Sequence, residues 1–463
     1  MDLEFATEFF DQFTNFERIQ PVRTDFRLDK LERLCEIFGR PERACPCFHV
    51  AGSKGKGSIT TFSGSILKAS GKKTVGLYRS PALTHFTDRI SEVDGPFSEA
   101  VYRAAFDELK VGAEKFRREN PHTRLTYFEL VTLYAFLVFR EAKCDYAVYE
   151  VGLGGRLDAT NVVDPKVAII STIELEHTEI LGDTLEKIAA EKAGIIKPGV
   201  PVVVGPQKSK TVKDVFRKVA QEKRAGELVF LPDELKTGYF LDDEKRLKMH
   251  VDALDVDLRL VGDFQAKNAL ATATAARLAL PTISDEAVKS GLERASLPGR
   301  FEILTNAELF DFPKIPYLVL DGAHTEGSIK GSVATLATYR DLLAKERTYD
   351  SCLTDFALDE PPLLLFACAR GKQVEEMSRA LDGAFSEVIL TKPGDFKKPD
   401  LPRAEQAFRQ TSLKTTLIED YQIALETALA LANETSRGLV VLGSLYLVAE
   451  AKKYLRSLSP SPW

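Results

Sequence analysis

The sequence lacks a long hydrophobic run. Its most apolar stretches, residues 132–139 and 439–449, are much shorter than the ~20 residues that a transmembrane helix needs. The acidic opening, MDLEFATEFFDQF, has none of the basic residues that begin a secretory signal peptide. We therefore expect a cytoplasmic protein that has no membrane partner.

Cysteine is scarce: six are scattered at positions 35, 45, 47, 144, 352 and 368. Cys45-Pro46-Cys47 does not have C-x-x-C spacing, and no second pair completes a zinc set. This usage excludes a disulfide scaffold and predicts free thiols in a reducing compartment.

A strong excess of charge is also missing. There are 62 Lys and Arg against 68 Asp and Glu, a net charge of −6, which argues against a dedicated nucleic-acid or anionic-membrane partner. No repeat or low-complexity segment is present. The 463 residues are 44% hydrophobic and 28% charged, as in soluble globular proteins, and their number favours two or three domains.

Short β-branched runs alternate with helical patterns along the chain. We expect strands at residues 46–51, 73–77, 145–151, 166–171 and 200–204, and later at 317–320, 363–368, 387–390, 415–418 and 438–442. A helix is expected after the first strand, at 56–70, and a hairpin at 238–251 interrupts the alternation. The pattern predicts an α/β fold with a mostly parallel sheet covered on both faces. Pro298-Gly299 divides it into expected domains 1–297 and 298–463.

The strongest local motif is HVAGSKGKGS, residues 49–58, between an expected strand and an expected helix. Three glycines allow the backbone N–H groups to surround an anion, and the helix N-terminus adds partial positive charge. Lys56 can reach the β/γ-phosphates of a nucleotide and Ser58 can ligate Mg²⁺. The spacing is shorter than in GxxxxGK[ST], and a ligand-free flexible turn is the alternative.

Other polar residues follow later strands. Glu150 ends an apolar strand, and a buried carboxylate is rare unless it is paired or bound to metal. His177 closes the segment ELEH, and Lys192 falls in the last turn of an expected helix that Asp183 and Glu186 would open as a capping box. Without further context, a structural role is favoured for His177, and for Lys192 a role in complementing the helix dipole.

Taken together, these motifs resemble those of the folylpolyglutamate synthase/dihydrofolate synthase family, a branch of the Mur ligase superfamily. The resemblance runs from about residue 26 to 451. Besides the loop, it rests on SPAL at 80–83, YFEL at 127–130, EVGLGGRLDATN at 150–161, HTEILGDTLEKIAAEKAGIIKPGVP at 177–201, FQAKNA at 264–269, PGRFE at 298–302, LDGAH at 320–324 and GSLYLVAE near the end.

The resemblance implies an N-terminal P-loop ATPase domain and a smaller C-terminal Rossmann-like domain, with the active site between them. It implies an ATP-dependent ligase that activates the carboxylate of a folate or of dihydropteroate as an acyl phosphate and joins L-glutamate to it. It assigns catalysis to Lys56, His177 and Lys192, the last as a carbamylated lysine, and two Mg²⁺ ions to Ser58, Ser80, Glu150 and His177. Phe128 and Asp158 would contact the pterin; the alternative is that Phe128 is a core aromatic residue and Asp158 caps the turn that leads to Asn161. ATP would bind Gly52, Ser53, Lys54, Gly55, Lys56, Gly57, Ser58, Asn268, Arg300, Asp321 and His324.

The chain departs from the family pattern at Lys54, Ala82, Thr325 and the Arg370-Gly371-Lys372 segment. Three alternatives therefore remain open: tail extension of folates only, a catalytically inactive ATP-binding relative, and a Mur-type ligase of cell-wall precursors. The third would need a UDP-binding domain ahead of a loop that here begins at residue 52, so we do not expect it. Retention of Ser80, Glu150, His177 and Lys192 argues against the second. We expect small-molecule substrates only and a monomer.

Overall fold

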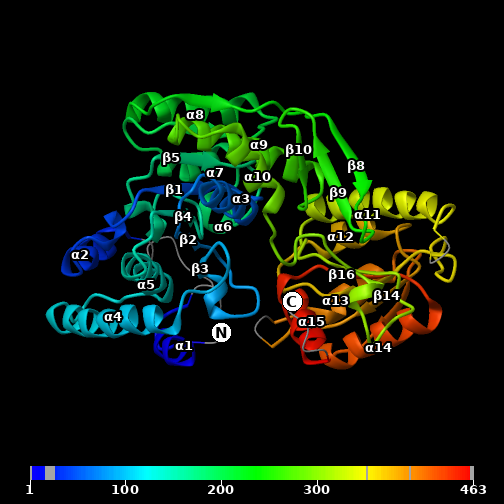
Figure 1. Cartoon of the computed structure of the whole chain (residues 1–463). Coiled ribbons are helices and arrows are strands. Elements are labelled where there is room, and N and C mark those ends of the chain that lie inside the picture. The colour runs from blue at the N-terminus through cyan, green and yellow to red at the C-terminus, as the bar shows by residue number, and fades with distance from the viewer. Residues whose placement is uncertain (1–2, 16–26, 351–352, 396–397, 459–463) are drawn as a thin grey trace. The chain divides into compact units, whose positions relative to one another are not determined.

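The computed structural model describes residues 3–15, 27–350, 353–395 and 398–458, and Cys352 and the start of the family resemblance lie outside them (Figure 1). The chain forms two compact units. Unit 1 comprises residues 1–236, 251–256 and 264–295, and unit 2 comprises residues 237–250, 257–263 and 296–463.

Unit 1 is built on a seven-stranded sheet of order β3-β2-β4-β1-β5-β6-β7. All pairings are parallel except β2 with β3. Every residue of β1 and β4 is buried, as expected for strands covered on both faces. The strands are β1 (Cys47–Ala51), β2 (Val75–Tyr78), β3 (Ile90–Glu92), β4 (Tyr146–Glu150), β5 (Val167–Ile170), β6 (Val202–Val204) and β7 (Leu228–Phe230).

The helices of unit 1 pack on this sheet and on one another. α3 (Lys56–Ala69) lies against β1, β2 and β4, and α10 (Asp285–Arg294) packs so closely on α3 that a Cβ on Gly291 would lie 2.5 Å from Ile66 Cα. α5 (Tyr127–Glu141) packs on β2 and on α4 (Glu99–Glu119). The others are α1 (Glu4–Phe10), α2 (Asp29–Ile37), α6 (Thr178–Leu181), α7 (Leu185–Lys192), α8 (Lys210–Lys223) and α9 (Asp263–Ala279).

Unit 2 contains a six-stranded sheet of order β11-β12-β16-β13-β14-β15, in which only β11 runs antiparallel to its neighbour. The strands are β11 (Glu302–Thr305), β12 (Tyr317–Leu320), β13 (Leu363–Phe366), β14 (Glu387–Leu390), β15 (Lys414–Leu417) and β16 (Leu439–Leu442). The helices are α11 (Glu326–Glu346), α12 (Val374–Leu381), α13 (Leu401–Phe408), α14 (Tyr421–Thr435) and α15 (Leu445–Leu458).

A third sheet has the order β10-β9-β8 and consists of β8 (Thr237–Leu241), β9 (Leu247–Val251) and β10 (Val256–Leu258). Its β8–β9 turn is attached to unit 2, because Tyr339 Oη of α11 donates to Lys245 O at 2.9 Å and Lys245 Nζ pairs with Glu346. Residues 237–250 and 257–263 thus group with unit 2, although the expected boundary had put them in domain 1–297. That boundary remains a prediction about independent folding.

The α/β class, the mostly parallel sheets and the expected hairpin are all present. One local prediction was wrong: Asp183 does not open α7. The N-cap is Thr184, whose hydroxyl accepts from Lys187 N at 3.2 Å, while Asp183 pairs with Lys187 Nζ in solvent. Threonine and aspartate are both common N-cap residues, so the sequence alone does not show whether Asp183 or Thr184 caps the helix. Lys192 is in the last turn of α7, as expected.

Candidate functional site

The phosphate loop leaves β1 and enters α3, and two of its glycines are sterically required. Gly52 has φ +136°, and a Cβ there would lie 1.8 Å from Ser171 Oγ. Gly55 has φ +84°, and its Cβ would lie 2.5 Å from Asn268 Oδ1. The loop backbone is therefore held in a conformation that only glycine adopts easily, beside Asn268 of α9.

The segment that follows β5 holds this loop in place. Ser53 N donates to Thr172 O at 3.0 Å, Ser53 Oγ accepts from Glu174 N at 3.0 Å, and Ser171 Oγ donates to Lys54 O. The sequence analysis missed Ser171, although its place at the end of a buried strand beside the expected loop strand was a usable signal. The loop is thus preorganised by its neighbours.

Two lysines and one carboxylate gather at the loop. Lys56 Nζ and Lys192 Nζ both donate to Gly52 O, at 3.1 and 2.9 Å, and Lys192 Nζ also pairs with Glu176 Oε1 at 2.8 Å. Burial lowers the pKa of Lys192 to about 8, against the opposing effect of Glu176. Burial alone would raise the pKa of Glu176, but Lys56 and Lys192 lower it to about 2.

Glu176 lies in the segment ELEH, and the sequence pattern alone predicts no role for it. In the structure it is the anion that balances the lysines of the loop. This arrangement places two ammonium groups beside the loop glycines, as expected of a loop that binds an anion.

Oxygen ligands suited to magnesium lie at the carboxyl ends of neighbouring strands. Val50 of β1 is in register with Glu150 of β4, and Ser80 N lies 3.4 Å from Glu150 Oε2. Glu150 and Ser58 are buried. Hydroxyl and carboxylate oxygens are the donors that Mg²⁺ prefers, usually one or two carboxylates completed by phosphates and water, so these residues fit such an ion.

His177 is placed differently. It is exposed, has φ +47° and precedes the short α6. Within the described ranges, no three His, Cys, Asp or Glu side chains come together as a metal cluster. A metal role for His177 therefore rests on the family resemblance.

The loop after β4 carries Asp158, and Phe128 of α5 lies against its first residues. Phe128, in the first turn of α5, covers Gly152 so closely that a Cβ there would lie 2.3 Å from the ring. Asp158 is buried, and its carboxylate accepts from Thr160 N, Thr160 Oγ1 and Leu153 N at 3.0, 2.6 and 2.9 Å. Burial raises its pKa, and these hydrogen bonds oppose the rise.

The remaining expected ATP residues cluster in unit 2, at the end of β12. Asp321 is buried and accepts from Ser332 Oγ at 2.5 Å, and burial raises its pKa. His324 Nδ1 lies 2.7 Å from Gly322 O and therefore carries the proton, since a carbonyl only accepts. A Cβ on Gly322 would lie 3.0 Å from Arg300 Nη1. Thr325, one of the departures, caps α11 through Ser328 N.

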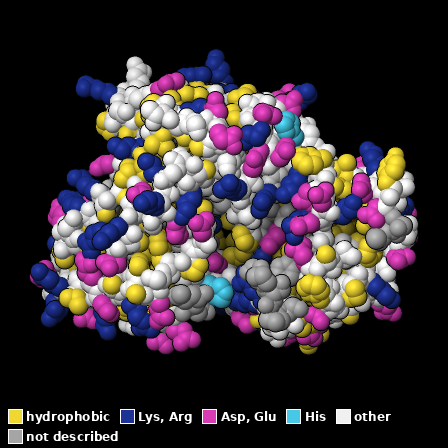
Figure 2. Space-filling model, viewed as in Figure 1, with side chains coloured by type: hydrophobic (Ala, Val, Ile, Leu, Met, Phe, Trp, Pro, Cys, Tyr) yellow, Lys and Arg dark blue, Asp and Glu magenta, His cyan; other side chains and the backbone are white. Residues whose placement is uncertain are grey.

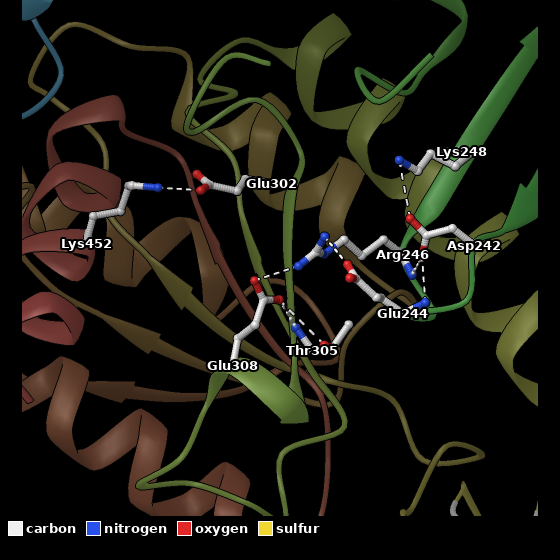
Figure 3. Close-up of polar contacts among 8 residues, drawn as sticks. All are labelled: Asp242, Glu244, Arg246, Lys248, Glu302, Thr305, Glu308 and Lys452. Atoms are coloured by element: carbon white, nitrogen blue, oxygen red, sulfur yellow. Dashed lines mark hydrogen bonds and ion pairs between the residues drawn. The ribbon is translucent and has the colours of Figure 1, made fainter. Parts of the chain in front are cut away.

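Arg300 also lines a cavity of about 500 Å³ within unit 2, between β11 and the β8–β9 turn. Figure 3 shows the charged network along it: Arg246 pairs with Glu308 at 2.7 Å and with Glu244, and Lys248 pairs with Asp242 at 3.2 Å. Two of these pairs lie within the turn and its flanking strands, and the pair of Arg246 with Glu308 joins the turn to the segment that follows β11.

The exposed charges are mixed in sign. On the face shown in Figure 2, Lys and Arg side chains are interspersed with Asp and Glu. Among the helices that the structure describes, none is long and apolar enough to cross a membrane.

Comparison with known proteins gives consistent matches. The Mur ligase middle domain model matches residues 50–276. A dihydrofolate synthase/folylpolyglutamate synthase of Bacillus subtilis is 30% identical over 442 residues, 93% of this chain and 95% of the relative. The structure of Mycobacterium tuberculosis folylpolyglutamate synthase complexed with ADP aligns with a TM-score of 0.81 at 25% identity, covering 98% of both chains. Escherichia coli FolC in complex with DHPP and ADP aligns with a TM-score of 0.75 at 25% identity, covering 98% of both chains.

Proposed function

Because the chain belongs to the folylpolyglutamate synthase/dihydrofolate synthase family, we propose that it is an ATP-dependent ligase that joins L-glutamate to folates and to dihydropteroate. The γ-phosphoryl group of ATP is transferred to the substrate carboxylate, giving ADP and an acyl phosphate. The amine of glutamate attacks the acyl carbon, phosphate leaves, and an amide remains. The observation that carries this proposal is the glycine-restricted loop with Lys56 and Lys192 on Gly52 O.

Several residues of the chain have defined parts in this scheme. The N–H groups of residues 52–58 and Lys56 would bind the phosphates, and the ammonium of Lys56 would leave Gly52 O to meet them. Ser58, Ser80 and Glu150 would hold Mg²⁺, with His177 at a second ion. A bound Mg²⁺ neutralises charge on the transferring phosphoryl group.

Further ATP contacts are proposed for Asn268, Arg300, Asp321 and His324. Asn268 is supported by its place against Gly55. The other three are supported by their proximity to one another at the end of β12.

Extension of folate tails alone is a second candidate. It is favoured by Asp158, whose carboxylate is buried and already accepts hydrogen bonds from its own loop. A carboxylate engaged in this way is poorly placed to accept from a pterin. Phe128 is half-buried and keeps a ring face for either substrate.

The test is phosphate release by the full chain with ATP, Mg²⁺ and L-glutamate, and either tetrahydrofolate or dihydropteroate. We expect release that depends on glutamate and on the pteridine substrate, with a product heavier by one glutamyl residue. Release that needs neither substrate, or no release with either, would refute the ligase proposal. Release with tetrahydrofolate only would favour the second candidate.

A further inference from the structure

A buried hydrogen-bond chain connects β1 to the loop after β4. His49 Nε2, on β1, lies 2.9 Å from Thr160 Oγ1, and Thr160 Oγ1 lies 2.6 Å from Asp158 Oδ1. His49 and Thr160 are both fully buried, with no exposed surface. His49 is three residues before Gly52. These hydrogen bonds therefore join β1, which leads into the phosphate loop, to the loop after β4 that carries Gly152 and Asp158.

The direction of each hydrogen bond follows from the proton count. The Thr160 hydroxyl has one proton, which it donates to the Asp158 carboxylate. Its oxygen must therefore accept from His49, so the proton of the neutral imidazole is on Nε2. Nδ1 is then a bare acceptor, and it is buried without a hydrogen-bond partner.

A neutral histidine with one unsatisfied nitrogen is a costly choice for a packed strand. Its neighbours Phe48 and Val50 are apolar and fully buried, and an apolar side chain at position 49 would leave no imidazole nitrogen unpaired. The use of the other nitrogen, Nε2, offsets that cost. What Nε2 does is hold Thr160, and through it Asp158.

Asp158 in turn fixes the backbone of its loop. Its two oxygens accept from Leu153 N on one side and from Thr160 N on the other, closing residues 153–160 into a defined turn. The beginning of that turn, Gly152, lies under the Phe128 ring, and Glu150 precedes it. Movement of the turn would therefore shift the residues proposed to face the substrate and the metal.

We propose that His49 and Thr160 are positioning residues for the ligase reaction, which hold the 152–160 turn in alignment with the phosphate loop. The inference rests on the proposed function, because alignment matters only if a carboxylate must meet a γ-phosphate. Reacting atoms must approach to about 3–3.5 Å, and a displacement of ~1 Å costs about 100-fold in rate. Neither residue touches substrate in this scheme.

The test compares His49→Gln with His49→Asn in the full chain. The glutamine amide can place an N–H near the position of Nε2, whereas the shorter asparagine cannot reach Thr160. We expect Asn to lower kcat about 10- to 100-fold and Gln to restore it to within a few-fold of wild type. The Kd for ADP, measured by calorimetry, should change less than threefold in both, because the nucleotide is held by residues 52–58.

Thr160 provides the second arm, in case position 49 does not tolerate substitution. Thr160→Val removes the hydroxyl at nearly constant volume and should repeat the loss of kcat, while Thr160→Ser should retain activity. Equal kcat for Gln and Asn at 49, together with wild-type kcat for Thr160→Val in folded protein, would overturn the proposal.

A spectroscopic measurement separates this inference from the proposed function. In ¹⁵N-histidine-labelled protein, the His49 resonances should show a protonated Nε2 and a bare Nδ1, and Thr160→Val should change them. A proton on Nδ1 would overturn the hydrogen-bond chain whether or not the protein is a ligase. If the hydrogen bonds from His49 through Thr160 to Asp158 are confirmed but the wild-type protein releases no phosphate, the proposed function fails and the positioning role fails with it.

Discussion

The buried ammonium of Lys192 donates to Glu176 Oε1 at 2.8 Å, beside the carbonyl of Gly52. Glu176, from the segment that follows β5, therefore supplies the negative charge beside the lysines of the loop, and Lys56 and Lys192 lower its pKa to about 2.

Lys192 is expected to be carbamylated in the active enzyme. Burial brings its pKa to about 8, so a substantial fraction of the amine is neutral near that pH and can form an N–C bond to CO₂ with release of a proton. With ¹³C-bicarbonate, a carbamate resonance should appear in the complex with ATP and Mg²⁺ and disappear in Lys192→Ala. Lys187→Ala, on the exposed face of the same helix, is the matched control. Full activity of Lys192→Ala would contradict the assignment.

Lys56→Ala should lower kcat by about 10²–10³-fold while the protein stays folded. In the proposed function its ammonium meets the β/γ-phosphates, and loss of one such electrostatic contact typically has this effect. Phosphate release is the assay, thermal unfolding reports the fold, and Lys187→Ala again serves as the control. Unchanged kcat would remove the loop from the mechanism.

Phe128→Ala should lower kcat/KM for dihydropteroate by about tenfold, because a stacked aromatic face is lost. Phe310→Ala removes a ring that is 65% exposed and should have no effect. Both substrates are to be compared in wild type, Phe128→Ala and Asp158→Ala. If wild type ignores dihydropteroate, the chain only extends folate tails. If wild type uses it and neither variant changes its turnover, Phe128 and Asp158 do not contact the pterin.

Acid should destabilise unit 1 through His49. Burial, with a contribution from the charge of Lys197, lowers the pKa of His49 to about 3. An unfolded histidine titrates near about 6.5, so the unfolded state binds the extra proton as the pH falls below that value, and stability is lost. At pH 5 the loss is about 2 kcal/mol. Urea unfolding should show this fall in the free energy of unfolding between pH 7 and pH 5 in wild type, and a smaller fall in His49→Gln. An equal fall in both proteins would mean that His49 is protonated at pH 5 in the folded protein.

Most strands of both sheets could be predicted because they are buried on both faces and form β-branched runs. The strands that were missed are β3, β7, β10 and β11. β3 and β11 are antiparallel edge strands and β7 is a parallel one, and all four have only three or four residues. Runs of three or four residues at the edge of a sheet give only a weak periodic pattern in the sequence.

The motif residues of the candidate site could be predicted from the sequence, but the residues that hold them in place could not. Lys56 and Glu150 belong to recognisable sequence motifs. Ser171 and Glu176 do not: Ser171 contacts Lys54, more than a hundred positions earlier, and Glu176 contacts Lys192, sixteen positions later. Asp158 illustrates the remaining ambiguity. The sequence allows a pterin ligand or a cap for the turn, and only its hydrogen bonds show how fully the turn uses it.

The path of the chain between the two units has a consequence for dissecting the protein. It passes from one unit to the other at residues 236–237, 250–251, 256–257, 263–264 and 295–296. A fragment ending at residue 296 would keep the β8–β9 turn but lose Tyr339 and Glu346, which hold Lys245. A fragment that ends there is therefore expected to be less stable than the same residues in the full chain, because residues 237–250 and 257–263 are separated from the rest of unit 2.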